Sequence, residues 1–341
     1  MYQPGPRNLI TDVDGILVGN AHHEAVRSGV SVVLPQGRVV AACDVRGGAP
    51  GTRETDALDP ASLSELVDAI VLSGGSVYGL DAASGTVAWL GERGRGVQLA
   101  NAPRVAPVVP GAILFDLANG GDKAWGMNPP YRDLAVAACG GAGADFALGN
   151  SGAGFGARAG DIKGGLGSAS LVADDGLQIG ALVAVNAFGS VLVPGTKHFW
   201  AAPFELGDEF GGFGAAPRGA IPQDPLAATK ASLAAPAPLG NTTIGVVAVN
   251  AALTRSEARR IAVMAQDGLA RAIRPVHAPL DGDVLFVIAT GARPLTSSFR
   301  PLDLTMLGTL CADCVARASA RGVYAALTLG AAQGYRERFG V

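Results

Sequence analysis

Several strand-length apolar runs in this chain show no alternation with polar residues. The clearest are residues 177–186, 244–250 and 284–290, and shorter runs occupy 30–34 and 39–43. A strand with one face in water alternates apolar and polar side chains, whereas a continuous apolar run indicates a strand buried on both faces. The sequence therefore predicts an α/β fold of layered sheets covered by helices or by a second sheet.

Apolar residues at helical spacing lie between these runs. They predict helices over about 61–71, 78–91, 254–274 and 304–327. The third begins with Thr254 followed by Glu257, the pattern of a capping box. No internal repeat or low-complexity linker divides the chain, so we expect a single domain over residues 1–341.

The net charge and the content of charged residues limit the kinds of partner that this chain can bind. The net charge is −3 with only 16% charged residues, which gives no electrostatic footprint for nucleic acid or an anionic membrane. The longest apolar runs fall well short of the ~20 residues of a membrane span, and the first residues contain no apolar signal segment. We expect a cytoplasmic enzyme acting on small molecules or peptides.

One long segment breaks the order of strands and helices. Residues 201–240 carry six prolines among alanines and glycines, and their apolar residues follow neither helical nor strand spacing. The segment ends at Asn241, and Thr242 opens an apolar strand. A flexible arm, residues 201–241, that runs into a fixed core strand is the arrangement that a self-cleaving enzyme requires.

Cleavage before Thr242 would supply a nucleophile and its base together. A threonine hydroxyl needs a base to remove its proton. A freed α-amine has a pKa of about 7.7 to 8.0 and can serve as that base on its own residue.

Other chemistries are weakly supported. The glycine-rich stretch 140–167 matches neither the dinucleotide nor the P-loop pattern, and close backbone packing explains it better. The four histidines lack metal-ligand spacing with acidic residues. We therefore expect no metal and no cofactor.

Five motifs together resemble one known family. They are VLSGGSVYGL at 71–80, KGGLGSAS at 163–170, ALVAVNAFGSV at 181–191, NTTIGVV at 241–247 and RAIRPVHAPLDGDVLF at 271–286. The chain resembles, over about residues 12–329, the self-cleaving N-terminal-nucleophile hydrolases. These include the L-aminopeptidase/D-amidase-esterase DmpA, the β-peptidyl aminopeptidases and the nylon-oligomer hydrolase NylC. The Asp-Gly-Asp turn at 281–283 looks most like NylC.

The resemblance implies a layered αββα sandwich, cleaved into residues 1–241 and 242–341. It also implies that Thr242 is the nucleophile released by the cut after Asn241. Asp281 and Asp283 would then hold the new amine and orient the hydroxyl, since a nearby carboxylate favours the charged form of an amine. Without the family, this turn is simply a good entry into a strand.

Lys163 and Asn186 match two further site residues of the family. Lys163 would depress the pKa of the amine or place a water, and the Asn186 amide would bind the oxyanion. One departure concerns Phe115, which precedes Asp116 where relatives commonly have a tyrosine. If that hydroxyl binds the oxyanion or the leaving group, water or a backbone N–H must replace it here, so we treat Phe115 and Asp116 as candidate pocket residues.

These observations predict a self-processing amidohydrolase or aminopeptidase. Its substrates could be small peptides, β-peptides, amino-acid amides or 6-aminohexanoate oligomers. Two alternatives stay open: an acyltransferase of the ornithine-acetyltransferase type, and a non-cleaving binding protein with the same fold. The resemblance also implies a homo-oligomer, a tetramer of cleaved protomers.

Overall fold

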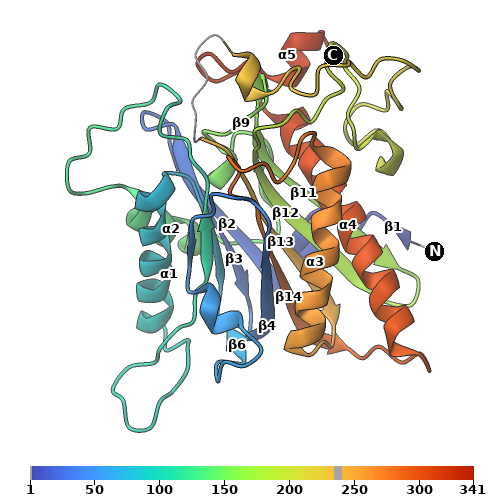
Figure 1. The fold of residues 1–341 in the computed structure, drawn as a ribbon. Coiled ribbons are helices and arrows are strands. Elements are labelled where there is room, and N and C mark those ends of the chain that lie inside the picture. The colour runs from blue at the N-terminus through green and yellow to red at the C-terminus, as the bar shows by residue number, and fades with distance from the viewer. Residues whose placement is uncertain (1, 234–239) are drawn as a thin grey trace.

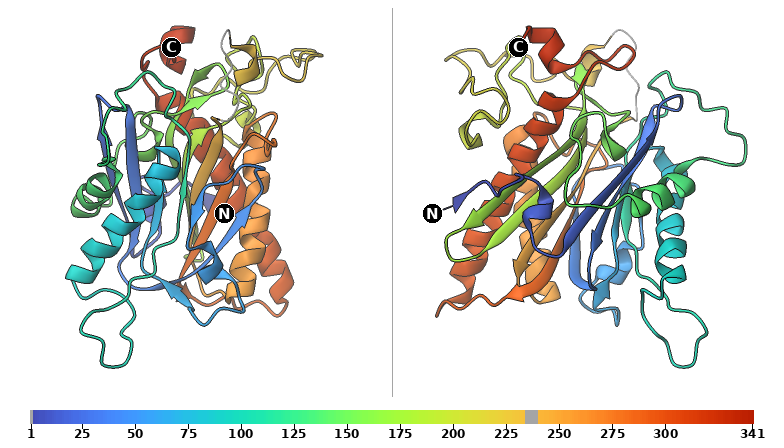
Figure 2. Two further views of the ribbon diagram at one scale, coloured as in Figure 1. Left: turned by 60° about the vertical axis from the view of Figure 1, so that its left-hand side comes forward. Right: turned by 180° about the vertical axis from the view of Figure 1, so that it is seen from behind.

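The chain folds into two stacked sheets with helices on both outer faces (Figure 1). A computed structural model describes residues 2–233 and 240–341. The larger sheet has the order β1-β11-β12-β13-β14-β4-β6, and the smaller has the order β2-β3-β7-β8-β5. The layers are seen side by side in Figure 2.

The larger sheet is antiparallel except between its two middle strands, β13 and β14, which are parallel. Its strands are β1 (Tyr2–Gln3), β11 (Gly165–Ala173), β12 (Gln178–Asn186), β13 (Thr242–Ala251), β14 (Val284–Arg293), β4 (Val39–Val45) and β6 (Leu66–Val67). Helices α3 (Arg255–Ala272) and α4 (Arg300–Ala325) cover its outer face, and the short α5 (Tyr335–Phe339) follows.

The smaller sheet lies against the inner face of the larger one. It contains β2 (Ile16–His23), β3 (Ser28–Pro35), β7 (Ile70–Ser73), β8 (Gly111–Ile113) and β5 (Thr52–Arg53). Its outer face is covered by α1 (Asp81–Glu92) and α2 (Tyr131–Gly140) (Figure 1). A separate pair, β9 (Arg158–Ala159) and β10 (Ile162–Lys163), forms a tight hairpin.

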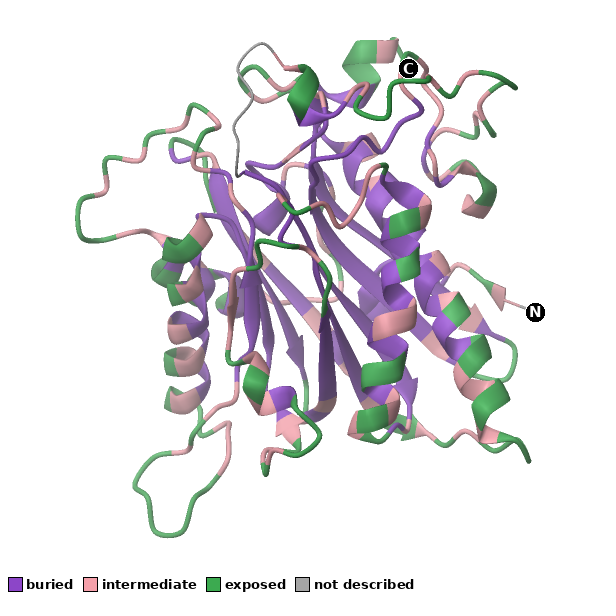
Figure 3. Cartoon of the chain, viewed as in Figure 1, coloured by how far each residue is buried: buried purple, intermediate pink, exposed green. Residues whose placement is uncertain are grey.

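Three apolar clusters fill the three spaces between the four layers. Along β12, Val183 packs toward α3 and α4, whereas Leu182 and Ala184 pack between the sheets. Burial on both faces explains the continuous apolar runs, and most residues of the central strands are buried in Figure 3. The predicted layered αββα arrangement is confirmed.

Most of the predicted helices are confirmed, with one exception. The capping box at Thr254 is present, because its side chain accepts from the Glu257 amide while Glu257 accepts from the Thr254 amide. The helix predicted over 61–71 is wrong, since this stretch holds β6 and β7 instead. Leu63, an apolar residue within this stretch, is 97% exposed.

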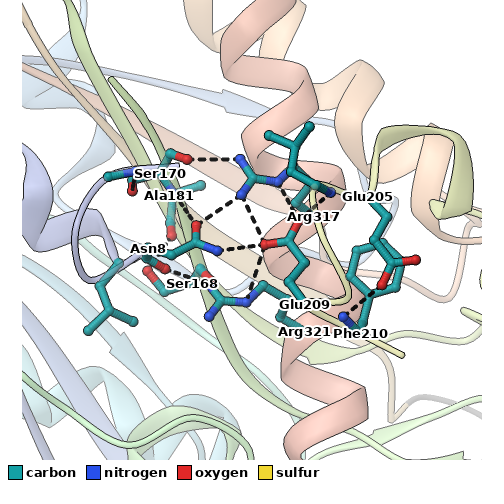
Figure 4. A network of polar contacts seen from close by, with 12 residues as sticks. Asn8, Ser168, Ser170, Ala181, Glu205, Glu209, Phe210, Arg317 and Arg321 are labelled. Atoms are coloured by element: carbon teal, nitrogen blue, oxygen red, sulfur yellow. Dashed lines mark hydrogen bonds and ion pairs between the residues drawn. The ribbon is translucent and has the colours of Figure 1, made fainter. Parts of the chain in front are cut away.

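The segment from residue 201 to 233 crosses the surface with only short 3₁₀ turns, and its anchors include a buried ion pair. The Glu209 side chain is 6% exposed and accepts hydrogen bonds from Nε and Nη2 of Arg317 on α4, at 2.6 and 2.9 Å (Figure 4). Asn8 and Arg321 join the same network. The approach to the predicted cut site is therefore tied to α4 and to the N-terminal residues.

Candidate active site

The junction between Asn241 and Thr242 lies at the start of a central strand. Thr242 is the first residue of β13 and pairs in register with Asn186, the last residue of β12. Asn241 forms a parallel bridge with Asp281. Both junction residues are buried, so the peptide bond between them is held inside the fold.

The carbonyl of Asn241 has two donors. The amide of Gly282 donates to it at 3.1 Å, and the Thr242 hydroxyl donates to the same oxygen. The Asn241 side chain is buried, yet its Oδ1 and Nδ2 have no partner among the described residues. The Thr242 hydroxyl is thus in contact with the peptide group that precedes it.

Gly282 can occupy its position only because it has no side chain. A Cβ there would lie 2.6 Å from the carbonyl oxygen of Ala49 and 2.8 Å from the Thr242 hydroxyl. Both distances are shorter than a carbon–oxygen contact allows. The glycine of the Asp-Gly-Asp turn therefore lets the turn approach the threonine.

The two aspartates of this turn hold backbone amides around the junction. Asp283 accepts from the Thr243 amide at 2.7 Å, and its other oxygen accepts from the His277 amide and meets the His277 ring at 2.8 Å. Asp281 accepts from the Phe188 and Ala278 amides. Burial, together with the charge of Asp283, raises the pKa of Asp281 to about 6.

A cavity of about 370 Å³ opens beside the junction. Four residues singled out in the sequence line it, namely Phe115, Asp116, Lys163 and Asn186, and so does Gly240. Thr242, Asp281 and Asp283 do not line it, although Thr242 pairs in register with Asn186, which does. The structure thus divides the predicted site residues between the cavity wall and the junction.

Lys163 and Asn186 both donate hydrogen bonds to backbone carbonyls. The Lys163 ammonium donates to the carbonyls of Gly164 and Gly154, at 2.7 and 3.2 Å, and burial lowers its pKa to about 7. The Asn186 amide donates to the carbonyls of Phe115 and Gly240. Asn186 therefore links the Phe115 segment to the residue just before the junction.

Asp116 lies deeper than Phe115. Its Oδ1 accepts from the Gly75 amide at 2.8 Å, and burial raises its pKa to about 6. The Gly75 amide belongs to the glycine-rich turn between β7 and α1, which explains why that turn approaches the cavity. Asp116 is thus held by backbone at the floor of the site.

Comparison with known proteins agrees with this architecture. The model of Peptidase family S58 matches residues 8–337. The chain belongs to peptidase family S58. It is therefore a hydrolase of amide bonds, as the resemblance implied.

Relatives of this S58 peptidase include an uncharacterized aminopeptidase of Mycobacterium tuberculosis, 45% identical over 97% of this chain and 98% of its own length. A 6-aminohexanoate-oligomer endohydrolase of a Kocuria strain is 27% identical over 84% and 76%.

Two solved structures share the fold of the S58 chain. The Burkholderia β-aminopeptidase has a TM-score of 0.67 at 22% identity, covering 96% of this chain and 89% of its own. The L-aminopeptidase/D-Ala-esterase/amidase of Ochrobactrum anthropi, described as a variant of the Ntn hydrolase fold, has a TM-score of 0.68 at 22% identity, covering 95% and 88%. The N-terminal-nucleophile type of fold is confirmed.

Sequence reasoning missed Lys230 in this S58 site. Its buried ammonium donates to the carbonyl oxygens of Asn186 and Gly240 and to the Asn186 side chain, at 2.9 to 3.1 Å. Burial lowers its pKa to about 7. The available signal was a single lysine in an alanine- and proline-rich stretch that otherwise has no charge after Asp224.

No group of three or more histidine, cysteine, aspartate or glutamate side chains in residues 2–233 and 240–341 is placed to hold a metal ion. Within the same ranges, no helix is long and apolar enough to cross a membrane.

Proposed function

We propose that the protein is a self-processing amidohydrolase that cuts itself between Asn241 and Thr242 and then uses Thr242 as an N-terminal nucleophile. The observation that carries the proposal is the contact of the Thr242 hydroxyl with the Asn241 carbonyl, whose oxygen also accepts from the Gly282 amide. A nucleophile and a donor for the developing charge thus meet at one peptide bond.

The cut proceeds in two balanced steps. The Thr242 oxygen attacks the Asn241 carbonyl carbon, its proton passes to the departing Thr242 nitrogen, and the C–N bond breaks to leave an ester on the threonine. During attack the negative oxygen is stabilised by the Gly282 N–H. Water then hydrolyses the ester, which gives Asn241 a carboxylate and returns the Thr242 hydroxyl beside a free α-amine.

Turnover repeats the same chemistry on an external amide. The freed amine accepts the proton of the hydroxyl, attack forms an acyl-enzyme ester, and water releases the acid. Asn186, adjacent to Thr242 in register, supplies an oxyanion donor once Gly240 has moved away. Asp283 fixes Thr243 and so the position of the new terminus, while Asp281 and Lys163 set the local charge.

The substrates that we propose are small amides or peptides, in keeping with relatives named aminopeptidases and 6-aminohexanoate-oligomer hydrolases. Mass spectrometry of the purified protein tests the mechanism directly. We expect two polypeptides, of which one begins at Thr242. Thr242→Ala should leave a single chain with no amidase activity.

Thr243 offers a matched control. Its side-chain hydroxyl is buried one residue away and has no hydrogen-bond partner among the described residues. Thr243→Val should therefore be cut and active. A chain that hydrolyses amides while continuous through residues 241 and 242 would overturn the proposal.

A further inference from the structure

The carbonyl oxygen of Gly240, one residue before Asn241, accepts hydrogen bonds from two side chains. Nδ2 of Asn186 donates to it at 3.2 Å, and the ammonium of Lys230 donates to it at 2.9 Å. Gly240, Asn186 and Lys230 all line the cavity beside the junction. Two donors that converge on one carbonyl oxygen are the arrangement that stabilises a negative oxygen in acyl transfer.

This pair of donors is distinct from the one that serves the cut. The Asn241 carbonyl accepts from the Gly282 amide and from the Thr242 hydroxyl. Among the described residues, neither Asn186 nor Lys230 donates to that oxygen. Self-cleavage therefore leaves the pair without a part in stabilising its own oxyanion.

Lys230 is attached to the fold by contacts that the cut does not touch. It begins a short 3₁₀ turn, and its backbone amide donates to the Phe188 carbonyl at 3.0 Å. Two residues earlier, the Ala228 carbonyl accepts from the Asp161 amide at 3.2 Å. These anchors precede the residues that lead to Asn241, so Lys230 should stay in place when the new chain end moves away.

Lys230 also fixes which way the Asn186 amide faces. Oδ1 of Asn186 accepts from the Arg158 backbone amide at 2.9 Å and from the Lys230 ammonium at 3.1 Å. Because donors surround Oδ1, Nδ2 must point the other way, toward the carbonyls of Phe115 and Gly240. The ammonium donates to the Asn186 carbonyl as well, at 3.0 Å, so its three hydrogens are all used.

Departure of Gly240 would leave two buried donors without this acceptor. Lys230 and Asn186 are both buried, and a buried donor without a partner is costly. A substrate carbonyl oxygen would satisfy both donors. The interaction would strengthen as negative charge develops on that oxygen, because a hydrogen bond between charged groups is stronger than one to a neutral carbonyl. The side chain of Phe115 has no hydroxyl to donate in their place.

We infer that Lys230 is a catalytic residue that, together with Asn186, forms the oxyanion site for turnover, and that the Gly240 carbonyl occupies this site in the uncut chain. This inference rests on the proposed function. It assigns separate oxyanion donors to the two reactions of one nucleophile, a backbone N–H for the cut and two side chains for external substrates.

The step at the substrate balances without proton loss from Lys230. The Thr242 oxygen attacks the amide carbon, its proton passes to the free α-amine, and the carbonyl electron pair moves onto the oxygen held by Lys230 and Asn186. When this pair returns, the C–N bond breaks and the departing nitrogen takes the proton from the α-amine. Lys230 acts at the carbonyl oxygen, which every amide has, so its role is the same for α-, β- and ω-amino acyl groups.

The first test separates turnover from self-cleavage. The p-nitroanilides of L-alanine, β-alanine and 6-aminohexanoic acid are assayed, and the one that the wild type splits fastest is used. Lys230→Met should lower kcat by about 10²–10³ and leave KM within about threefold, because the lost contact strengthens only in the transition state. Self-cleavage, followed on gels of the freshly made chain, should slow by less than about tenfold. Lys230→Arg, which keeps a charged donor, should retain part of kcat.

A matched lysine provides the control. Lys197 contacts the ring of Phe213 and does not line the cavity. Lys197→Met removes the same charge and should leave kcat unchanged.

The second test uses the aldehyde analogue of the best acyl group and the corresponding alcohol. The aldehyde adds the Thr242 oxygen and so imitates the tetrahedral intermediate, whereas the alcohol does not react. Lys230→Met should weaken the aldehyde by a factor similar to its loss of kcat and leave the alcohol unchanged. In a crystal structure of the cleaved wild type with the aldehyde, the former carbonyl oxygen should lie about 2.7–3.1 Å from Lys230 Nζ and Asn186 Nδ2.

Four results would overturn the inference: wild-type kcat in Lys230→Met, an equal slowing of self-cleavage and turnover, an equal weakening of aldehyde and alcohol, or a hemiacetal oxygen more than about 4 Å from Lys230 Nζ. Failure of the proposed function differs from these, since the chain is then continuous or no fragment begins at Thr242. The wild-type complex decides the matter even if Lys230→Met does not fold.

Discussion

The molecule contains two arginines, Arg317 and Arg158, whose guanidinium groups differ in whether they have hydrogen-bond partners. The Arg317 side chain is 1% exposed, and it binds both oxygens of Glu209, the carbonyl of Ser170 and the side chain of Asn8 (Figure 4). The Arg158 residue is half-buried, and its guanidinium has no hydrogen-bond or ion-pair partner among the described residues.

The difference distinguishes a charged side chain that stabilises the fold from one that is available to bind a ligand. A buried charge with all its donors used holds two parts of a fold in one arrangement. A charge whose donors are unused is ready to bind something outside the chain. Around the cavity, Arg158, the raised pKa of Asp116 and the lowered pKa of Lys163 occur together, as expected of a functional site.

The largest effect on stability should come from breaking the ion pair between Glu209 and Arg317. Glu209→Gln leaves Arg317 buried without its counter-charge and should lower the free energy of unfolding by about 3–5 kcal/mol. Urea unfolding of the Thr242→Ala protein with and without this change measures the loss, since that background keeps the chain continuous. A loss below about 1 kcal/mol would mean that the network contributes little.

A slightly smaller effect, on rate instead of stability, is expected at Asn186. Asn186→Ala should slow amide hydrolysis by about 10²–10³, or roughly 3 to 4 kcal/mol of transition-state stabilisation. Self-cleavage should slow less, because the scissile carbonyl of Asn241 accepts from Gly282. Gel analysis of the cut and initial rates on one amide compare the two, and unchanged turnover would remove Asn186 from the site.

The lowered pKa of Lys230 should make the free energy of unfolding depend on pH. Burial lowers the pKa of Lys230 from 10.5 to about 7, so between these values the folded chain binds fewer protons than the unfolded chain, and stability rises with pH. For one lysine the slope reaches about 1.4 kcal/mol per pH unit. In the Thr242→Ala background, adding Lys230→Met should flatten the rise, and parallel curves for the two proteins would contradict the lowered pKa.

The smallest effect should be found at an exposed pair. Arg132 and Asp81 approach only to 4.0 Å, with both side chains about half exposed. Arg132→Gln should change the free energy of unfolding by less than about 1 kcal/mol. Urea unfolding checks this, and a change as large as that of Glu209→Gln would erase the contrast between buried and surface ion pairs.

The layers could be predicted from the sequence because burial on both faces leaves its mark in every strand. The strands β12, β13 and β14 are apolar along most of their length, and most of their residues are buried. The helix predicted over 61–71 failed because two short buried strands, close together, imitate helical spacing.

The site was only partly predictable. Motifs pointed to Thr242, Asn186 and Lys163, but the register that sets Asn186 beside Thr242 depends on how β12 pairs with β13. The donor to the Asn241 carbonyl is the backbone N–H of Gly282, which residue type does not reveal. Lys230 and Arg158 reach the cavity from a turn-rich segment and a two-residue strand, where no period exists to place a side chain.

The position of β13 has a consequence for how the protein is assembled. The residues from 242 onward contribute the two middle strands of the larger sheet, flanked by β12 and β4 from the earlier part of the chain. A cut before Thr242 would therefore leave two polypeptides interleaved, neither with a complete sheet. Their refolding after denaturation would become a bimolecular reaction, so the yield of native enzyme would depend on protein concentration, whereas the first folding event would not.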